Sequence, residues 1–347
     1  MLILLELATR STLAEAQSGT WQSLTFGQTI GSFGLLLTDG SVLEPLEAYV
    51  FIPDITGSYV NGTLAPAPPL PTGYNPGAFA SAVLPDGRVI VEGGECSPWS
   101  IPCSKNTNYT NLGAIFDPDA SSWTTVAPPT GWATIGGAPS VVLPNGTFMM
   151  GQADPSGTTA QALLDAATMK WTPTGTGKAD QNFEEGWVLL PNGRVLVVQT
   201  HNLNGSPNPA QQYDPETGPW TSAGISPVSL TDPGSNEIGP GVLRPDGTVI
   251  VFGALTNGPD HTAIYNSATG EWSAGPDLPA IGGQYYSTDD APAAVLPNGN
   301  VLFAASPSKF EAPVHFFEFD GSTITQVAKH IAKGAVRLLT HHVFWQF

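Results

Sequence analysis

The chain has 347 residues, of which 41% are hydrophobic and only 12% are charged, and it carries 39 glycines and 33 prolines. Its 29 acidic and 11 basic residues give a net charge of −18, which excludes a basic counterion-releasing surface and therefore nucleic acid as a partner. No apolar run approaches the roughly 20 residues needed to cross a bilayer, so the sequence predicts no membrane span.

The N-terminal stretch falls into two parts. Residues 1–18 contain a short apolar segment and an Ala-Glu-Ala sequence at 14–16 that suits signal peptidase, so we interpret them as a degenerate secretion signal or a disordered N-terminus. Residues 19–26, GTWQSLTF, have the pattern of the last strand of a blade, although no earlier strands of that blade precede them. We expect residues 19–347 to form a single domain.

A β-hairpin motif recurs along the whole chain, and SAVLPDGRVIVEGGE at 81–95 is its clearest copy. Pro85 sets the φ of the second turn position, Asp86 tolerates the third, and Gly87 can adopt the left-handed conformation that starts the return strand. The turn glycines of the six copies are spaced by 47, 59, 47, 54 and 52 residues, and this period in units made of strands predicts a propeller. They are Gly40, Gly87, Gly146, Gly193, Gly247 and Gly299.

A second hairpin follows each of these, and its last strand opens on a tryptophan in four of the six units. Two hairpins make a four-stranded antiparallel blade, so the sequence predicts an all-β propeller with six complete blades. In the first and sixth units a leucine and an isoleucine take the tryptophan's place. The residues at this position are Leu64, Trp123, Trp171, Trp220, Trp272 and Ile324.

A further, incomplete blade is expected at the ends of the chain. Residues 335–347 have the register of another hairpin but lack its turn residues, and residues 19–26 supply an outer strand without inner ones. We therefore predict an incomplete seventh blade that the N-terminal strand closes. A six-bladed ring with loose ends is the alternative.

The second unit alone carries an insertion, CSPWSIPCSKNTNY, between its second and third strands. Both cysteines of the chain, Cys96 and Cys103, lie in it. Two thiols seven residues apart in one loop favour a local disulfide, and hence an oxidising compartment. A metal site with only these two ligands is the weaker alternative.

These repeats resemble the kelch-type propellers of the galactose-oxidase-like branch, whose units carry LPDGRV followed by GG, as in LPDGRVIVEGG at 84–94. The resemblance covers roughly residues 20–328 and implies the fold. That branch includes copper radical oxidases, in which two Tyr and two His hold the metal and one Tyr is crosslinked to a Cys. Those ligands have no assigned counterpart here, because no His follows the adjacent Tyr285 and Tyr286. We therefore predict no metal or cofactor, and neither copper nor calcium has support.

The candidate binding residues come from one face of the expected propeller. The LPDG turns share the turn face, where their Asp and Asn side chains are turn formers. Loops between second and third strands and loops between blades share the opposite side, which we call the loop face. Carboxylates, amides, imidazoles and aromatic rings gather there, as in a sugar or cation site, although each has a structural alternative. These residues are Glu92, Glu95, Gln152, Glu185, His201, Asn236, Glu237, His261, Tyr285, Tyr286, Asp289 and Asp290.

The sequence favours a monomeric binding module that is secreted, periplasmic or on the cell surface and recognises a glycan or a protein through its loop face. The first alternative is a carbohydrate-active enzyme, an oxidase or a lyase, in which His201 or His261 acts with Tyr285 or Tyr286 as base and acid. The second is a structural domain of a larger extracellular protein. No catalytic residue is assigned, because none of these side chains has the spacing of a catalytic motif.

Overall fold

The computed structural model describes residues 33–95, 108–154, 156–201, 207–307 and 313–327, together with residues 22, 24, 25 and 203. These residues form 24 β-strands in six four-stranded sheets. Within the described ranges no segment is helical, so none is a candidate for a membrane-spanning helix.

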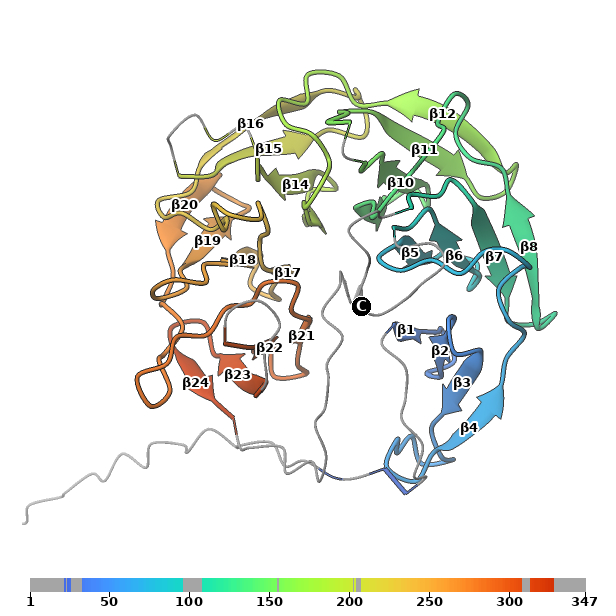
Figure 1. Ribbon diagram of the computed structural model, residues 1–347, viewed down its shortest axis with the longest axis horizontal. Helices are drawn as coiled ribbons and strands as arrows, with labels where there is room; N and C mark the ends of the chain where they lie inside the picture. The colour runs from blue at the N-terminus through green and yellow to red at the C-terminus, as the bar shows by residue number, and fades with distance from the viewer. Residues whose placement is uncertain are drawn as a thin grey trace, which may run out of the picture.

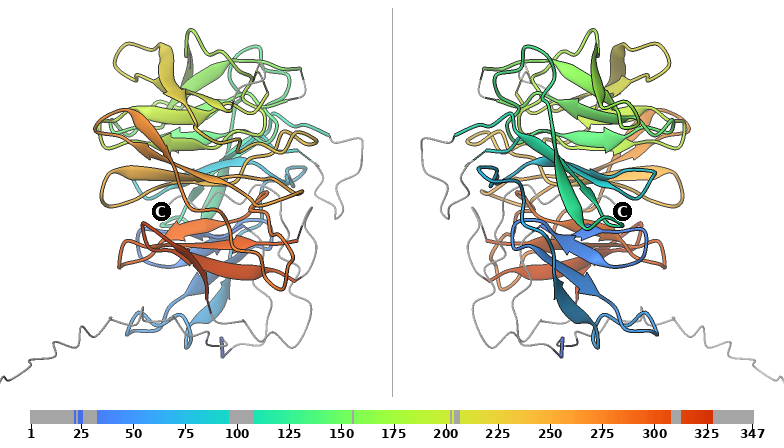
Figure 2. Two further views of the ribbon diagram at one scale, coloured as in Figure 1. Left: turned by 90° about the vertical axis from the view of Figure 1, so that its left-hand side faces the viewer. Right: turned by 90° about the vertical axis from the view of Figure 1, so that its right-hand side faces the viewer.

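The six sheets are the blades of a propeller, each running from an inner strand near the centre to an outer strand at the rim (Figure 1). Figure 2 shows the twist of the blades from two sides. The first three blades are β1 (Leu35–Leu36), β2 (Val42–Glu44), β3 (Tyr49–Ile52) and β4 (Thr63–Pro66); β5 (Ala80–Val83), β6 (Val89–Glu92), β7 (Gly113–Asp117) and β8 (Ser122–Val126); and β9 (Ser140–Val142), β10 (Phe148–Gly151), β11 (Gln161–Asp165) and β12 (Lys170–Thr174). The other three are β13 (Trp187–Leu189), β14 (Val195–Val198), β15 (Pro209–Tyr213) and β16 (Trp220–Ile225); β17 (Gly241–Leu243), β18 (Thr248–Phe252), β19 (Thr262–Asn266) and β20 (Glu271–Ala274); and β21 (Ala293–Val295), β22 (Val301–Ala305), β23 (His315–Phe319) and β24 (Ile324–Gln326).

The predicted hairpin turns are confirmed in all six blades. Every turn glycine has a φ between 80° and 85°, a region that other residues rarely adopt. In the second blade, the Gly87 N–H donates to the Leu84 carbonyl at 2.9 Å, and the Leu84 N–H donates to the Arg88 carbonyl at 2.7 Å. The Asp86 side chain accepts the Arg88 N–H at 3.1 Å, which closes the turn.

The outer-strand tryptophans of the second to fifth blades each contact the blade before their own. Each indole N–H donates to an oxygen of the preceding blade or of the chain just after it: Trp123 to the Pro68 carbonyl at 2.9 Å, Trp171 to the Ala127 carbonyl at 2.8 Å, Trp220 to the Gln161 side chain at 3.2 Å and Trp272 to the Ala223 carbonyl at 2.8 Å. The tryptophan rings also pack on an aromatic ring of their own blade, as Trp123 does on Phe116 with centroids 5.2 Å apart. The repeated tryptophan is therefore a contact between blades.

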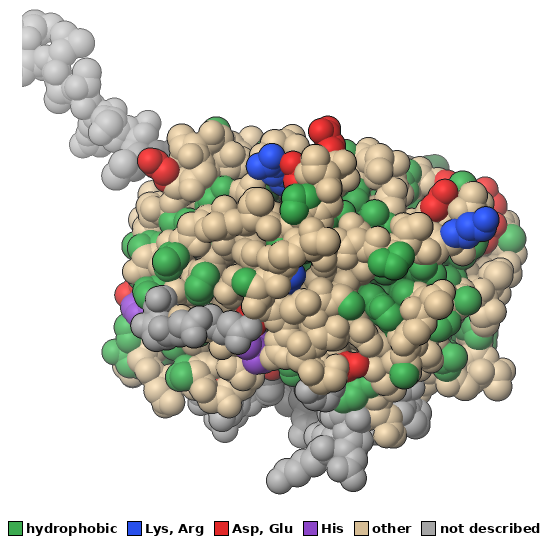
Figure 3. Space-filling model, turned by 90° about the horizontal axis from the view of Figure 1, so that it is seen from above, with side chains coloured by type: hydrophobic (Ala, Val, Ile, Leu, Met, Phe, Trp, Pro, Cys, Tyr) green, Lys and Arg blue, Asp and Glu red, His purple; other side chains and the backbone are tan. Residues whose placement is uncertain are grey.

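The core of the molecule lies between blades. Five clusters of buried apolar residues join successive pairs, from the first and second blades to the fifth and sixth. None of these clusters joins the sixth blade to the first, and Figure 1 shows a wider interval between those two than between other neighbours. The surface is sparsely charged, and Figure 3, which shows the rim from above, has few Lys, Arg, Asp and Glu side chains.

The all-β propeller with six four-stranded blades is confirmed. The predicted seventh blade falls on residues 19–26 and 335–347, which lie outside the described residues apart from Gln22, Leu24 and Thr25. The predicted disulfide between Cys96 and Cys103 and the N-terminal stretch 1–18 also lie outside them.

Candidate functional site

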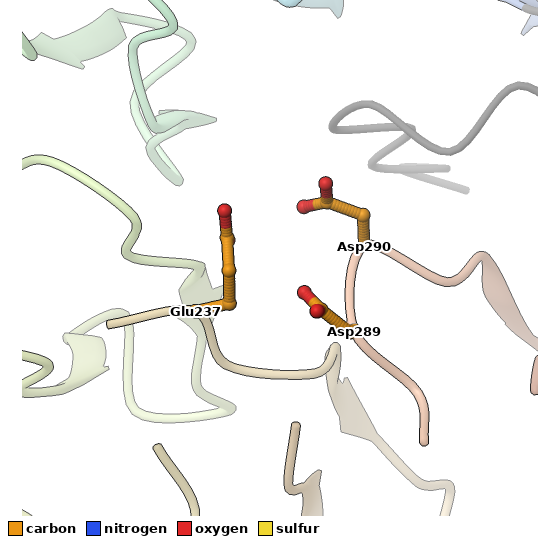
Figure 4. Close-up of side chains that lie close together, drawn as sticks. All are labelled: Glu237, Asp289 and Asp290. Atoms are coloured by element: carbon orange, nitrogen blue, oxygen red, sulfur yellow. The ribbon is translucent and has the colours of Figure 1, made fainter. Parts of the chain in front are cut away.

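The loop face carries a cluster of three acidic side chains, Glu237, Asp289 and Asp290. At least one carboxylate oxygen of each lies within 4.8 Å of the others. Glu237 comes from the loop before β17 and the two aspartates come from the loop before β21, and Figure 4 shows their carboxylates directed toward a shared space. Asp289 is only 3% exposed, whereas the other two are half-buried. In the part of the chain that the structure describes, no other group of three His, Cys, Asp or Glu side chains is arranged in this way.

A compact turn that begins at Asp232 places Glu237. The Asn236 N–H donates to the Asp232 carbonyl at 2.9 Å, and the Asp232 N–H donates to the Glu237 carbonyl at 2.9 Å. The Asp232 carboxylate accepts the backbone N–H of Ser235 at 3.0 Å. Asn236 has a φ of 67°, which asparagine tolerates better than most residues. Asn236 therefore holds the turn that presents its neighbour.

Asp289 and Asp290 follow a buried anchor in the next loop. Asp260, which is completely buried, accepts the Thr288 N–H at 3.1 Å. The Asp289 N–H donates to the Ser287 hydroxyl at 3.2 Å, and Asp290 has a φ of 52°. A left-handed backbone at this point turns the chain, so two successive carboxylates reach the same region.

The cluster lies in a region of concentrated negative charge. Burial raises the pKa of Asp260 to about 8, and the charge of Asp289 adds to this effect. Carboxylates so close together repel one another, so they are stabilised by a shared proton, by hydroxyl groups that donate hydrogen bonds, or by a cation. The donor atoms are all oxygen, which matches hydroxyl-rich ligands and hard cations such as calcium.

This donor set does not fit copper. Copper centres favour imidazole nitrogen, and the three acidic side chains offer none. A tyrosine and a histidine do meet elsewhere, where Tyr286 packs edge-on against His315 with ring centroids 4.9 Å apart. The His315 Nδ1 is already hydrogen-bonded to Gln326 at 2.7 Å. One tyrosine and one histidine are not the two of each that a copper radical oxidase uses, so the described residues do not match that centre.

Three of the other predicted carboxylates are buried away from the cluster. Glu92 is 0% exposed at the end of β6, neither of its oxygens has a hydrogen-bond partner among the described residues, and burial raises its pKa well above the usual range. Glu185 forms an ion pair with the Lys178 ammonium at 2.8 Å, with both side chains almost fully buried. Burial raises the pKa of Glu185 to about 7, against the opposing charge of Lys178. Glu95 is 8% exposed, and its backbone pairs with Gly77.

The remaining predicted residues make separate local contacts. The Gln152 side chain donates to the Thr134 carbonyl at 2.9 Å. His201 shares a hydrogen bond of 2.8 Å with the Thr200 hydroxyl, and burial lowers its pKa, while His261 bonds to Asp277 at 2.7 Å.

Tyr285 is 43% exposed and Tyr286 is 5% exposed. Within the described ranges, neither His201 nor His261 makes a hydrogen bond or ring contact with these tyrosines. The base-and-acid pairing that the enzyme alternative needs is therefore not assembled among the described residues.

Two polar residues that support the loop face were not anticipated. Lys178 donates to the Asp180 carbonyl at 3.0 Å and lies 5.4 Å from the ring centroid of Trp220. The Asp180 carboxylate, completely buried, accepts the backbone N–H groups of Thr200 and His201, both at 2.9 Å. Lys178 could have been identified from the sequence, because the chain has only 11 basic residues and a lysine in a loop is therefore unusual. Nothing in the sequence around Asp180 separates it from an ordinary loop aspartate.

The centre of the propeller offers a different environment. A cavity of about 720 Å³ is lined by the inner strands of all six blades. Its lining is mainly aliphatic, with Leu36, Val83, Val142, Val188 and Val242 among the residues. The cavity wall therefore offers few polar groups, whereas the polar side chains described above lie on the loops.

No protein-family model and no curated protein matches the chain. Among solved structures, it is similar to one described as a novel fungal alcohol oxidase with catalytic diversity among the AA5 family, in complex with copper. The identity is 19% and the TM-score is 0.56; the match covers 86% of this chain, which spans 64% of the length of that protein. At this identity the likeness concerns the fold alone. The chain thus has the kelch-like, galactose-oxidase-type propeller fold that its repeats resemble.

Proposed function

We propose that this chain is an extracellular binding propeller that recognises a glycan through the loops before its fifth and sixth blades. The observation that carries the proposal is the convergence of Glu237, Asp289 and Asp290 from two separate loops. Carboxylate oxygens accept hydrogen bonds from sugar hydroxyls, and acceptors on two loops can engage neighbouring hydroxyls of one ring.

An exposed aromatic ring lies in the same inter-blade loop. Tyr285 is 43% exposed, and it follows a tight hairpin in which Ile281 and Gln284 exchange backbone hydrogen bonds of 3.0 Å. Gly282 and Gly283 form the tip, with φ of 61° and 84°. A tyrosine held on an ordered hairpin offers a flat surface for the apolar face of a sugar ring. A protein ligand with a basic surface is the second candidate, since the net charge of −18 would attract it.

The test is a glycan array followed by affinity measurement on the best-binding glycan. Glu237→Gln keeps the size of the side chain but removes its charge, and we expect it to weaken binding by about tenfold, the effect of losing one charge-assisted hydrogen bond. The matched control is Glu216→Gln, since Glu216 is exposed in the turn between β15 and β16 on the turn face. Equal affinity of the Glu237 variant and the wild type, or no glycan bound at all, would overturn the proposal.

A further inference from the structure

The buried Asp260 side chain ties together two loops of the loop face. It lies in the loop between β18 and β19 and is 0% exposed. Its Oδ1 accepts the Leu255 N–H of the same loop at 3.0 Å, and its Oδ2 accepts the Thr288 N–H of the loop before β21 at 3.1 Å. Asp289 and Asp290 follow Thr288 directly (Figure 4). Asp260 therefore fixes the backbone from which two of the three clustered carboxylates extend.

Two glycines allow these loops to approach so closely. A Cβ on Gly253, which follows β18, would overlap the Asp260 carboxylate, and the Gly253 carbonyl accepts the Thr288 hydroxyl. A Cβ on Gly239, which precedes β17, would overlap that same hydroxyl. Gly239 lies two residues after Glu237. Thr288, which Asp260 holds, therefore packs against the loop that carries the third member of the cluster.

Two other blades have asparagine at the position of Asp260. Asp260 lies five residues before Tyr265, and Asn208 lies five residues before Tyr213 in the fourth blade. The two tyrosines are equivalent, because each pairs with the valine that lies two residues after the turn glycine of its blade. Asn111 holds the same position in the second blade. The repeat thus places an amide where the fifth blade has a carboxyl group.

The asparagine of the fourth blade both donates and accepts hydrogen bonds. Its Nδ2 donates to the Gln199 carbonyl at 2.7 Å and to the Thr231 hydroxyl. Its Oδ1 accepts the Leu230 N–H at 2.7 Å. Leu230 and Thr231 lie in the loop before β17, just as Thr288 lies in the loop before β21. Asn208 therefore links its blade to the next loop through a donor and an acceptor at once.

Asp260 can do the same only as the neutral acid. An ionised carboxylate accepts hydrogen bonds but cannot donate one, whereas the protonated form has one O–H donor. The Thr288 hydroxyl gives its proton to the Gly253 carbonyl, and its oxygen lies 3.5 Å from Asp260 Oδ2, where it can accept a long hydrogen bond. Burial, with a smaller effect from the charge of Asp289, raises the pKa of Asp260 to about 8. Asp260 is therefore predominantly neutral at pH 7 in the folded chain.

The surroundings of Asp260 offer little positive charge to its ionised form. Residues 226–240, 253–261 and 275–292, which form the three packed loops, contain no Lys or Arg. His261 can become positively charged, but its Nδ1 is hydrogen-bonded to Asp277 at 2.7 Å. The other titratable residues of these loops are Asp232, Glu237, Tyr285, Tyr286, Asp289 and Asp290.

We propose that Asp260 is a positioning residue of the candidate site, and that its proton controls whether the loop before β21 stays in place. As the neutral acid, Asp260 keeps Thr288 against the fifth blade. As the anion it has no proton to donate, lacks a positive partner and repels Asp289, so the loop opens and admits water to the carboxylate. The consequence for a ligand rests on the glycan-binding function proposed above, whereas the opening of the loop does not.

The test is amide hydrogen exchange of residues 284–292 in the full-length chain at pH 7 and pH 9, with each rate divided by the intrinsic rate at that pH. In the open loop Asp260 regains its ordinary pKa of 3.8, so the wild-type loop should open about tenfold more often at pH 9 than at pH 7. Asp260→Asn supplies the donor and acceptor that Asn208 has, and its loop should stay protected at both pH values. Asp277→Asn makes the same change at an exposed residue and should match the wild type.

Equal corrected exchange of the wild-type loop at the two pH values would overturn the proposal, as would a tenfold change in the Asp260→Asn chain. Asn208→Asp gives an independent check, because it places the acid in the fourth blade. Exchange of residues 228–232 should then acquire the same dependence on pH, and exchange that stays independent of pH would count against the proposal.

A binding measurement tests the positioning role. With a glycan found on the array, Asp260→Ala should weaken affinity about tenfold, since the Thr288 N–H loses its acceptor, and Asp260→Asn should restore the wild-type affinity. Wild-type affinity in the alanine variant would overturn this role. Absence of any bound glycan would contradict only the function proposed above, because the exchange experiment needs no ligand.

Discussion

The buried pair of Lys178 and Glu185 shows how a polar residue near the loop face serves stability. Their charged atoms are 2.8 Å apart, and their side chains are 1% and 0% exposed. Removing one partner of such a pair leaves a buried charge without compensation, which costs about 3 to 5 kcal/mol. Both residues lie in the loop between β12 and β13, so the loss of either partner should also disturb the conformation of that loop.

Lys178→Met should lower the free energy of unfolding by about 3 kcal/mol at pH 8 and by less at pH 5, because Glu185 takes up a proton in the variant at the lower pH. Urea unfolding at the two pH values measures this difference. Lys170→Met is the control, since Lys170 is exposed at the start of β12. A loss of equal size at both pH values would contradict the assignment.

Gly136 has no room for any side chain. Its φ is 80°, and a Cβ built on it would lie 1.7 Å from the carbonyl oxygen of Ala153. Gly131 has a similar φ of 86° with nothing within 4 Å. Gly131→Ala should therefore cost about 1 kcal/mol, the cost of the left-handed backbone alone, while Gly136→Ala should cost more than about 3 kcal/mol. Thermal unfolding of the two variants compares them, and similar melting temperatures would refute the steric argument.

Among the strands, the tryptophan contacts between blades are the clearest repeated element. Trp171→Phe keeps an aromatic ring on Phe148 but removes the hydrogen bond to Ala127. We expect a loss of about 1 kcal/mol, since water can replace the donor at this rim position. The same change at Trp272, which bonds to Ala223, should add to it because the two sites share no partner. Urea unfolding of both single variants and the double variant checks the sum.

The strands and turns could be predicted from the sequence because their signals are local. Pro85, Asp86 and Gly87 specify a turn within four residues, and the structure has that turn. The placement of loop side chains depends instead on packing between blades. Glu92 ends a strand at the loop face, yet its side chain turns into the interior beside Gly113, where only the missing Cβ leaves space. Strand-end positions carry no sequence signal that distinguishes these two orientations.

The geometry of the candidate site could not be predicted either, because its residues are far apart in the sequence. Glu237 and Asp289 are 52 residues apart, about one repeat, so sequence reasoning places both on the loop face. Their convergence within 4.8 Å arises from two turns with a left-handed residue, at Asn236 and Asp290. The left-handed residue itself is not a glycine in either turn, so the sequence does not mark its position. Whether these residues bind a ligand stays a prediction.

The molecule as a whole should be most stable in mildly acidic solution. Burial raises the pKa of Glu44 and of Glu185 to about 7, and that of Asp260 to about 8. These groups stay protonated in the folded chain at a pH where the unfolded chain has ionised them, so their contribution is full below about pH 4.5 and is lost as the pH rises through 7 to 8. Hydrogen bonds from Thr323 and Ser322 lower the pKa of Asp320 to about 2, although burial opposes this shift. The stability that the ionised Asp320 contributes is therefore lost as the pH falls below about 4.

The free energy of unfolding should therefore peak near pH 4 and fall as the pH rises toward 8. For Glu44 alone, a rise in pKa from 4.5 to about 7 corresponds to about 2 to 3 kcal/mol between pH 5 and pH 8. Chemical denaturation across this range measures the fall. Glu44→Gln should remove that part of it, and a flat profile in the wild type would disprove the argument.

Each tryptophan contact joins a blade to residues that precede it in the sequence, and this order affects how the chain folds during synthesis. Trp123, Trp171 and Trp272 bond to residues 55, 44 and 49 positions upstream, and never to a later blade. As each of these tryptophans leaves the ribosome, the blade to which it bonds has therefore already been synthesised.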